Sequence, residues 1–407
     1  MTAVVTRRRH WRLRRLGVAA LVAVLLTAPI TYSYARALTG PGHDSMAARS
    51  VEWLRDHRMG WLVDTAERRW FATHQAKVGG TPDAHVLTPP AAAHPDPASA
   101  TTAAPRAAAA APAVPTTSVA PPTSADPLAA RLAPPPPLPS PSPTPFPAEG
   151  TWLPLGPAIH GAPGAYVTST RPDAVHSSSV VAMAWFDPHV VAFRQFPGLW
   201  IPGAPWDRPA EVPPEDRGRL IATFSGGFRL GSSHGGMMLG GQVQRSTRDG
   251  AATLAIDAAA VPSIGAWNQD IPAIGAFDSV RQNLDLIVAD GQPNPALATD
   301  PNRLWGFTGP ANHQFVWRSG AGVLPDGALV WIGGPGLSIS TLADLFVRVG
   351  AVRAMQLDIN HEWVQFNTYS DVNGAIHGSR LLKDMRGPDD RWLSQDTRDF
   401  FAVFARP

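Results

Sequence analysis

Short apolar runs separated by glycine, proline and Asp-Gly pairs fill the C-terminal part of the chain, residues 151–407. Runs of about four to eight residues that are rich in β-branched and aromatic side chains are typical of strands. The pattern therefore predicts a strand-rich α+β domain with few helices. Its predicted strands include Tyr166–Ser169, Val180–Phe186 and Val190–Phe193 joined at Asp187-Pro188, Leu220–Phe224, Met237–Leu239, Thr253–Ile256 and Leu284–Val288.

The segment Arg318–Trp363 predicts a hairpin, a helix and a further strand. Two apolar runs flank Pro325-Asp326-Gly327, and an Asp-Gly pair in that position is a strong hairpin signal. Leu342, Leu345, Phe346 and Val349 then recur with helical spacing, with Thr341 as N-cap and Gly350 as C-terminal stop. The run Ala354–Leu357 predicts a buried strand that ends at Asp358. Ligands commonly bind at that end of a strand in open α/β sheets.

The polar cluster Asp358–Glu362 is the first candidate site, because it joins two carboxylates, an amide and an imidazole. Such groups suit acid–base chemistry near neutral pH. On an extended segment Asp358, Asn360 and Glu362 share one face, whereas His361 points elsewhere. The alternative is a hydrogen-bonded loop that closes the strand end.

Two further candidates are anion sites. The turn Ser225-Gly226-Gly227 could direct backbone N–H groups at an anion, although a glycine pair after a strand is more often only a tight turn. Arg318 could hold a phosphate or carboxylate through two hydrogen bonds, or form a structural salt bridge. The sequence requires no cofactor, but a divalent metal held by Asp358, His361 and either His234 or His313 remains an alternative.

The N-terminus predicts a membrane segment. Arginines crowd residues 1–15, which we expect in the cytoplasm, and an apolar stretch over residues 16–38 is long enough to span a membrane. The rest of the chain would then be extracytoplasmic. The alternative is a cleaved signal peptide with Ala35-Arg36-Ala37 as its cleavage site, which would make the protein secreted.

Two segments lie between this anchor and the domain. Residues 45–71 predict an amphipathic helical segment divided at Gly60, with tryptophans that suit a membrane interface or a packing partner. Residues 79–150 are rich in proline and alanine, which predicts a disordered, extended linker.

Composition excludes several classes of function. The chain has 407 residues, a formal net charge of +2 and a pI near 9.3 that owes much to the N-terminal arginines, so nucleic acid is not an expected partner. It has no cysteine, which excludes disulfides, thiolate metal sites and a cysteine nucleophile.

The order of motifs resembles that of the phosphodiester glycosidase family, of the uncovering-enzyme type that removes N-acetylglucosamine from a phosphodiester. That family carries N-G-G-F-F, R-x-A-x-G, a D-G hairpin, T-L-x-E/D-L-A and L-D-G-G-G-S. This chain departs from it at Ser225, at Arg229 and in the loop after Asp358. The matching motifs are Ser225-Gly226-Gly227-Phe228-Arg229, Arg318-Ser319-Gly320-Ala321-Gly322, Asp326-Gly327, Thr341-Leu342-Ala343-Asp344-Leu345 and Leu357-Asp358-Ile359-Asn360-His361.

The resemblance implies hydrolysis of a sugar-1-phosphodiester in or near the cell envelope. It implies that Arg318 and the Gly226-Gly227 turn hold the phosphodiester, with Ser225 and Asn360 beside them. Asp358 or Glu362 would serve as acid or base, assisted by His361 or His234. One alternative is a non-catalytic domain of the same fold that binds a phosphorylated glycan or wall polymer. Another is a scaffold that acts through residues 45–71.

Overall fold

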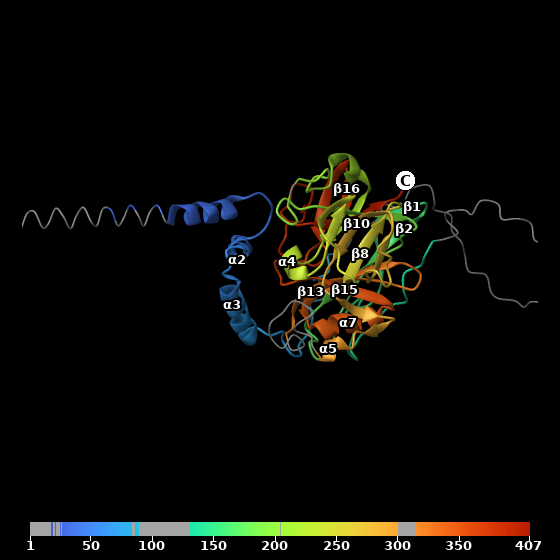
Figure 1. The fold of residues 1–407 in the computed structure, drawn as a ribbon. Helices are drawn as coiled ribbons and strands as arrows, with labels where there is room; N and C mark the ends of the chain where they lie inside the picture. The colour runs from blue at the N-terminus through green and yellow to red at the C-terminus, as the bar shows by residue number, and fades with distance from the viewer. Residues whose placement is uncertain are drawn as a thin grey trace, which may run out of the picture. The chain divides into compact units, whose positions relative to one another are not determined.

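The computed structural model describes residues 27–83, 86–88, 131–203, 205–299 and 314–407, together with Val18, Leu21 and Leu25. The chain divides into two compact units, Met1–His74 and Gln75–Pro407. Figure 1 shows the helices of the first unit and the strand-rich second unit.

The first unit is helical. Its helices include α2 (Met46–Asp56) and α3 (Gly60–Thr73), so the predicted break at Gly60 is observed. The Ser45 side chain caps α2 by accepting a hydrogen bond from the Ala48 N–H at 3.1 Å. Arg55 of α2 forms an ion pair with Glu67 of α3 at 3.0 Å. None of the helices in the described residues is long and apolar enough to cross a membrane. Residues 1–15 and part of the predicted span lie outside the described residues.

The second unit is built on an eight-stranded sheet in which every paired strand is antiparallel. Helix α7 (Ile339–Arg348) packs against its central strands, and the α7 residues Leu342, Leu345 and Phe346 are fully buried in a shared core. The strand order is β1 (Leu153–Ile159), β2 (Ala162–Thr170), β3 (Val181–Phe186), β14 (Leu329–Leu337), β13 (Val316–Val323), β15 (Arg353–Ile359), β11 (Leu286–Ala289) and β12 (Gln292–Pro293).

Two five-stranded antiparallel sheets complete the second unit. The short helical segments between the strands include, in the part of the chain that the structure describes, η2 (Pro214–Arg219), α4 (Leu230–Ser233) and α5 (Ala296–Thr299). One sheet has the order β7 (Gln242–Arg245), β6 (Met237–Leu239), β10 (Phe277–Gln282), β8 (Ala252–Asp257), β9 (Pro262–Ala266). The other has the order β17 (Ala375–Arg380), β16 (Phe366–Val372), β5 (Leu220–Ser225), β18 (Phe400–Ala405), β4 (Val191–Phe196).

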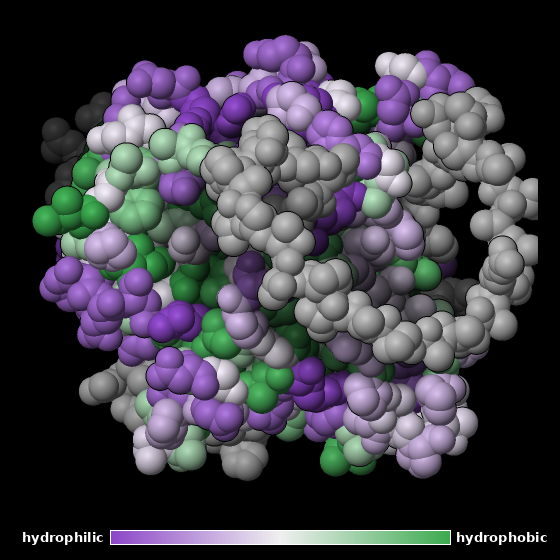
Figure 2. All heavy atoms as spheres, turned by 90° about the vertical axis from the view of Figure 1, so that its right-hand side faces the viewer, coloured by the Kyte–Doolittle hydropathy of each residue, from purple (hydrophilic) through white to green (hydrophobic). Residues whose placement is uncertain are grey.

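The largest core joins side chains from all three sheets. Phe224 of β5 stacks on Phe366 of β16 at 6.1 Å and on Phe401 of β18 at 5.4 Å between ring centroids. Aromatic contacts of this kind add to the free energy gained by removing the rings from water. Figure 2 shows one face of the molecule, on which hydrophilic and hydrophobic residues are mixed.

Most predicted elements are observed, with instructive differences. Helix α7 begins at Ile339 and is capped by Ser338, whose Oγ accepts from the Thr341 N–H at 3.0 Å, so Thr341 lies inside the helix. The strands on either side of Asp187-Pro188 belong to different sheets and do not pair. The main sheet is antiparallel, so the rule for strand ends in parallel α/β sheets does not apply to Asp358.

Part of the segment predicted as linker packs onto the second unit. Residues 131–150 place Leu138 and Phe146 in buried positions. The buried carboxylate of Glu149 forms an ion pair with Arg171 and accepts hydrogen bonds from Ser140 Oγ and the Phe146 N–H. Farther upstream, residues 86–88 form a bridge with residues 381–383. Residues 89–130 lie outside the described residues.

Candidate functional site

Asp358 lies near the end of β15, where a bulge in the pairing with β13 displaces the register. Its backbone N–H donates to Ser319 Oγ at 3.2 Å. The residue is 2 % exposed, and burial raises the pKa of its carboxyl to about 6, while the charge of Arg398 opposes that rise. A carboxyl with this pKa can both accept and donate a proton near neutral pH.

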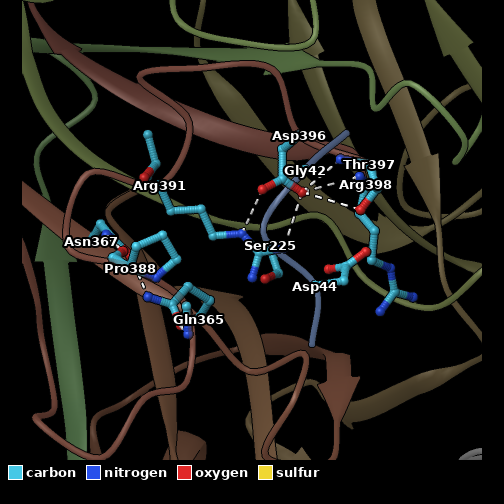
Figure 3. A network of polar contacts seen from close by, with 12 residues as sticks. Gly42, Asp44, Ser225, Gln365, Asn367, Pro388, Arg391, Asp396, Thr397 and Arg398 are labelled. Carbon is cyan, nitrogen blue, oxygen red and sulfur yellow. Dashed lines mark hydrogen bonds and ion pairs between the residues drawn. The ribbon is translucent and has the colours of Figure 1, made fainter. Parts of the chain in front are cut away.

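Three aspartates and three arginines from distant parts of the sequence gather around this position. Arg281 binds Asp399 through two contacts, 2.9 Å from Nε to Oδ2 and 3.3 Å from Nη2 to Oδ1. Arg391 binds Asp396 in the same way, at 2.9 and 3.0 Å. Figure 3 shows this pair from close by. The third pair is looser, because Arg398 Nη1 lies 3.8 Å from Asp358 Oδ1, beyond hydrogen-bond distance.

The turn after β5 packs against this cluster. Ser225 donates its Oγ proton to the Trp363 carbonyl at 2.7 Å, and the Gly226 N–H donates to the Asp399 carbonyl at 2.9 Å. A Cβ on Gly226 would lie 2.2 Å from Asp399 Oδ2, and Gly227 has a φ of +127°, so both positions require glycine. The fold thus brings Ser225, Gly226 and Gly227 to the Asp358 cluster. The Gly226 N–H is already engaged within the protein.

Arg318 lies on β13, the strand next to Asp358, and is completely buried. Its guanidinium donates to the Leu337 carbonyl at 3.0 Å and to Gln356 Oε1 at 2.9 Å. No carboxylate among the described residues forms an ion pair with it, and its Nη2 has no hydrogen-bond partner there. Burial lowers the pKa of Arg318 to about 9, so the side chain stays charged at neutral pH.

The loop after Asp358 directs its side chains away from that carboxylate. Asn360 has a φ of +84°, and its N–H donates to the Trp317 carbonyl at 2.8 Å. His361 stacks on Trp317, with 4.5 Å between ring centroids, and its Nε2 contacts the Asp384 carbonyl. Glu362 forms an ion pair with Arg386 at 3.3 Å. The contacts of His361 and Glu362 therefore connect this loop to Trp317, Asp384 and Arg386.

His234 is exposed at the end of α4 and has no hydrogen bond or ion pair with Asp358. Its carbonyl accepts from Arg248 Nε at 3.0 Å. The described residues contain no group of three His, Asp or Glu side chains that could hold a metal ion. The alternative metal ligand His313 lies outside the described residues.

The arginines and aspartates that surround Asp358 were not among the residues predicted from the sequence. The run Asp396-Thr397-Arg398-Asp399 directly precedes the apolar strand β18, and charged residues at such a boundary are usually solvated. The sequence marks this run only by its closely spaced opposite charges, which directly precede the apolar strand β18. Arg281 carried a weaker signal, because it is one of two charged residues, with Asp278, in a strand that is otherwise uncharged.

Comparison with known proteins finds distant structural neighbours only. No protein-family model matches the chain, and no curated protein matches it. The catalytic domain of zebrafish N-acetylglucosamine-1-phosphodiester alpha-N-acetylglucosaminidase, auto-inhibited by its pro-peptide, is 12% identical over 62% of this chain and 87% of that chain, with a TM-score of 0.41. A hypothetical protein from Synechocystis is 12% identical over 62% of this chain and 64% of that chain, with a TM-score of 0.39.

Proposed function

We propose that the second unit is a hydrolase of phosphodiester glycosidase type that acts on a sugar-1-phosphodiester. The observation that carries the proposal is the buried Asp358 carboxyl, whose pKa is raised to about 6 and which lies 3.8 Å from Arg398. A phosphodiester anion needs positive charge, and cleavage of its bond to the sugar needs an acid or base. Both kinds of group meet at Asp358. The order of motifs from Ser225 to His361 supports the same assignment.

In the proposed reaction, the oxygen of a water molecule forms a bond to the anomeric carbon of the sugar. The bond between that carbon and the phosphate oxygen breaks, and the electron pair leaves with a phosphomonoester. The proton lost by the water passes to Asp358 or to the departing phosphate. The products are free sugar and a phosphomonoester, and the reaction consumes one water.

The other residues of the proposed site have supporting roles. Arg318 supplies positive charge from the strand next to Asp358, Ser225 holds the loop of Trp363, and the glycine turn packs against Asp399. Asn360, His361 and Glu362 form the rim against which the sugar or leaving group would rest. His234 would take part only if substrate extends as far as α4.

We further propose that this unit works outside the cytoplasm on a cell-envelope glycan, held at the membrane by residues 16–38. The support is the arginine-rich start of the chain and the apolar stretch that follows it. Cleavage after Ala37 would instead release the protein.

The test measures free sugar released from a sugar-1-phosphate methyl diester by the full chain. We expect Asp358→Asn to lower the rate about 100- to 10,000-fold, the usual effect of losing general acid–base catalysis. Asp371→Asn is the matched control, because Asp371 is exposed on β16 and bonds only within its turn. Equal rates for all three proteins would refute the assignment of Asp358.

A non-catalytic domain that binds a phosphorylated glycan is the second candidate. The near-complete burial of Asp358 and Arg318 favours it, because a closed cluster can retain a ligand without admitting water to it. Tight binding of the diester by the wild-type chain with no release of sugar would support this function over hydrolysis.

A further inference from the structure

Two arginines are completely buried in the part of the chain that the structure describes, Arg281 and Arg318. Arg281 binds the carboxylate of Asp399 through two contacts, so its charge is balanced. Arg318 bonds instead to neutral oxygens, the Leu337 carbonyl at 3.0 Å and Gln356 Oε1 at 2.9 Å. A buried charge without a partner of opposite sign is strongly unfavourable. The charge of Arg318 therefore has no counterion among the described residues.

Two N–H donors beside this charge also lack acceptors. Arg318 Nη2 and Gln356 Nε2 are buried and have no hydrogen-bond partner within the described ranges. They belong to side chains that bond to each other, on the neighbouring strands β13 and β15. Buried polar atoms nearly always have a partner, which is a protein group, a water or an ion. The two donors therefore indicate a bound species that both side chains hold.

The local charge favours an anion over a water molecule. Burial lowers the pKa of Arg318 to about 9, which leaves the guanidinium charged at neutral pH, and no described carboxylate opposes that shift. The Leu337 carbonyl that Arg318 contacts directly precedes Ser338, the N-cap of the ten-residue helix α7. The start of a helix adds partial positive charge. A water could accept both hydrogen bonds, but it would leave this positive charge unbalanced.

The surroundings limit the size of the anion. Arg318 and Gln356 are both 0% exposed. The core between helix α7 and the main sheet is closely packed with apolar side chains. A phosphate or carboxylate carries several oxygens, each of which needs its own donor when it is buried. A halide is a single sphere that can accept from the two N–H groups.

We propose that Arg318 and Gln356 bind a halide ion beside the start of helix α7. The ion accepts hydrogen bonds from Arg318 Nη2 and Gln356 Nε2 and balances the guanidinium charge, so it stabilises the folded chain. This site goes beyond the proposed hydrolysis and does not depend on it, because the side chain of Arg318 contacts Leu337 and Gln356 and not Asp358. The ion would reduce any charge that Arg318 supplies to the Asp358 cluster.

The experiment follows thermal unfolding of the full chain in sodium chloride, sodium bromide and sodium gluconate at equal ionic strength. A ligand that binds only the folded chain raises the unfolding midpoint, and each tenfold increase in its concentration above the dissociation constant gives a similar further rise. We expect this dependence in chloride and in bromide. Gluconate is too large for the site and should not produce it.

Two substitutions should abolish the dependence on chloride by different routes. Arg318→Met removes the charge that the ion balances. Gln356→Glu keeps the shape of the side chain and gives Arg318 a carboxylate partner. This variant should unfold at a higher temperature than wild type in gluconate and should gain nothing from chloride. If Arg318→Met does not fold, Gln356→Glu decides the question.

Arg217→Met is the matched control. Arg217 also bonds to two backbone carbonyls, those of Val212 at 2.9 Å and Leu393 at 2.7 Å. Unlike Arg318, it has a carboxylate partner, Glu211, at 3.5 Å. Its variant should therefore keep the chloride dependence of wild type.

Several outcomes would overturn the halide site. Equal responses to chloride in all four proteins would show a general salt effect, and no response in wild type would show that no halide stabilises the fold. Stabilisation by dimethyl phosphate and not by chloride would assign Arg318 to substrate binding instead. Crystals grown in bromide give a direct check. We expect an anomalous peak beside Arg318 Nη2 and Gln356 Nε2, and a water there without bromide signal would refute the site.

Discussion

Asp358 should make folding stability depend on pH in a direction opposite to most carboxylates. Its pKa is raised from 3.8 to about 6 mainly because the charged form is buried. The folded chain then holds this proton more tightly than the unfolded chain. The group therefore stabilises the fold below about pH 4 relative to neutral pH, and this contribution is lost as pH rises towards and through about 6.

The comparison of wild type with Asp358→Asn isolates this contribution. The unfolding free energy of wild type relative to the variant should fall by on the order of 3 kcal/mol between about pH 4 and pH 7. Urea unfolding at several pH values measures it. Asp371→Asn, on an exposed turn, should give a nearly constant difference. A difference that rises with pH for Asp358→Asn would show that the carboxyl is ionised more easily in the folded chain.

Gly226 allows the turn after β5 to lie close to Asp399, because it has no side chain. A methyl group there would lie 2.2 Å from Asp399 Oδ2 and 2.9 Å from the Asp399 carbonyl. The Asp399 side chain cannot easily move away, because Arg281 binds its carboxylate. We expect Gly226→Ala to lower the unfolding free energy by about 1–3 kcal/mol, as overpacking does. Gly231→Ala, which meets nothing within 4 Å, is the control. Equal stabilities would mean that the turn can move away from Asp399.

At the scale of residues, the sequence predicts only part of the cluster that the fold brings together. Asp358 and the Ser225-Gly226-Gly227 turn come together, but Arg398 approaches Asp358 from a segment 40 positions later in the chain. Such a contact depends on the pairing of β18 with β5, which no local pattern specifies. The alternation expected for Asp358, Asn360 and Glu362 does not apply, because β15 ends at Ile359 and Asn360 has a φ of +84°, so residues 360–363 form a turn.

The N-cap of helix α7 was predicted at Thr341, about one turn after its observed position at Ser338. Both Ser338 and Thr341 can act as N-caps, but Ser338 has the extended backbone of a cap, and its Oγ accepts from the Thr341 N–H. We expect Ser338→Ala to lower the unfolding free energy by about 1 kcal/mol, the usual cost of losing an N-cap. Thr341→Ala should cost less, because its N–H remains capped. Chemical denaturation of both variants measures this, and the reverse order would place the cap at Thr341.

At the scale of elements, most strands with strong apolar character were predicted, but β18 was missed although its residues are apolar, and weakly patterned strands were missed as well. The Pro325-Asp326-Gly327 turn correctly predicts the β13–β14 hairpin, because a hairpin needs only neighbouring residues. Strands β16 and β17 form a polar, partly exposed hairpin that apolar runs do not reveal. The separation of β3 and β4 into different sheets depends on the pairing partners of each strand, so Asp187-Pro188 could not specify it.

At the scale of the whole molecule, the second unit begins before Thr151, the residue at which the sequence changes from proline-rich to strand-like. Composition places residues 131–150 with the linker, since proline and serine dominate them. Some of their other residues are nonetheless buried: Leu138 is 6 % and Phe146 is 8 % exposed, and Glu149 is 9 % exposed. A proline-rich segment costs less conformational entropy to order than an average one, so a few contacts suffice to fix it.

Glu149 is the contact that should decide whether this segment belongs to the folded unit. Its carboxylate pairs with Arg171 and accepts hydrogen bonds from the Arg171 N–H at 3.0 Å and the Phe146 N–H at 3.1 Å. Removal of one partner from a buried ion pair leaves the other charge uncompensated, which costs about 3–5 kcal/mol. We expect Glu149→Ala to lower the unfolding free energy of the chain by that amount, measured by urea titration. Glu215→Ala, on the exposed start of η2, should change it by less than about 0.5 kcal/mol.

Truncation tests the same boundary without changing a side chain. A fragment of residues 131–407 retains the Glu149–Arg171 pair and the buried Leu138, whereas a fragment of residues 151–407 exposes the surface they cover and leaves Arg171 without its carboxylate. We therefore expect the longer fragment to unfold at a higher temperature and in one cooperative transition. If both fragments unfold at the same temperature, residues 131–150 do not stabilise the domain, and the linker extends to residue 150 as composition alone suggests.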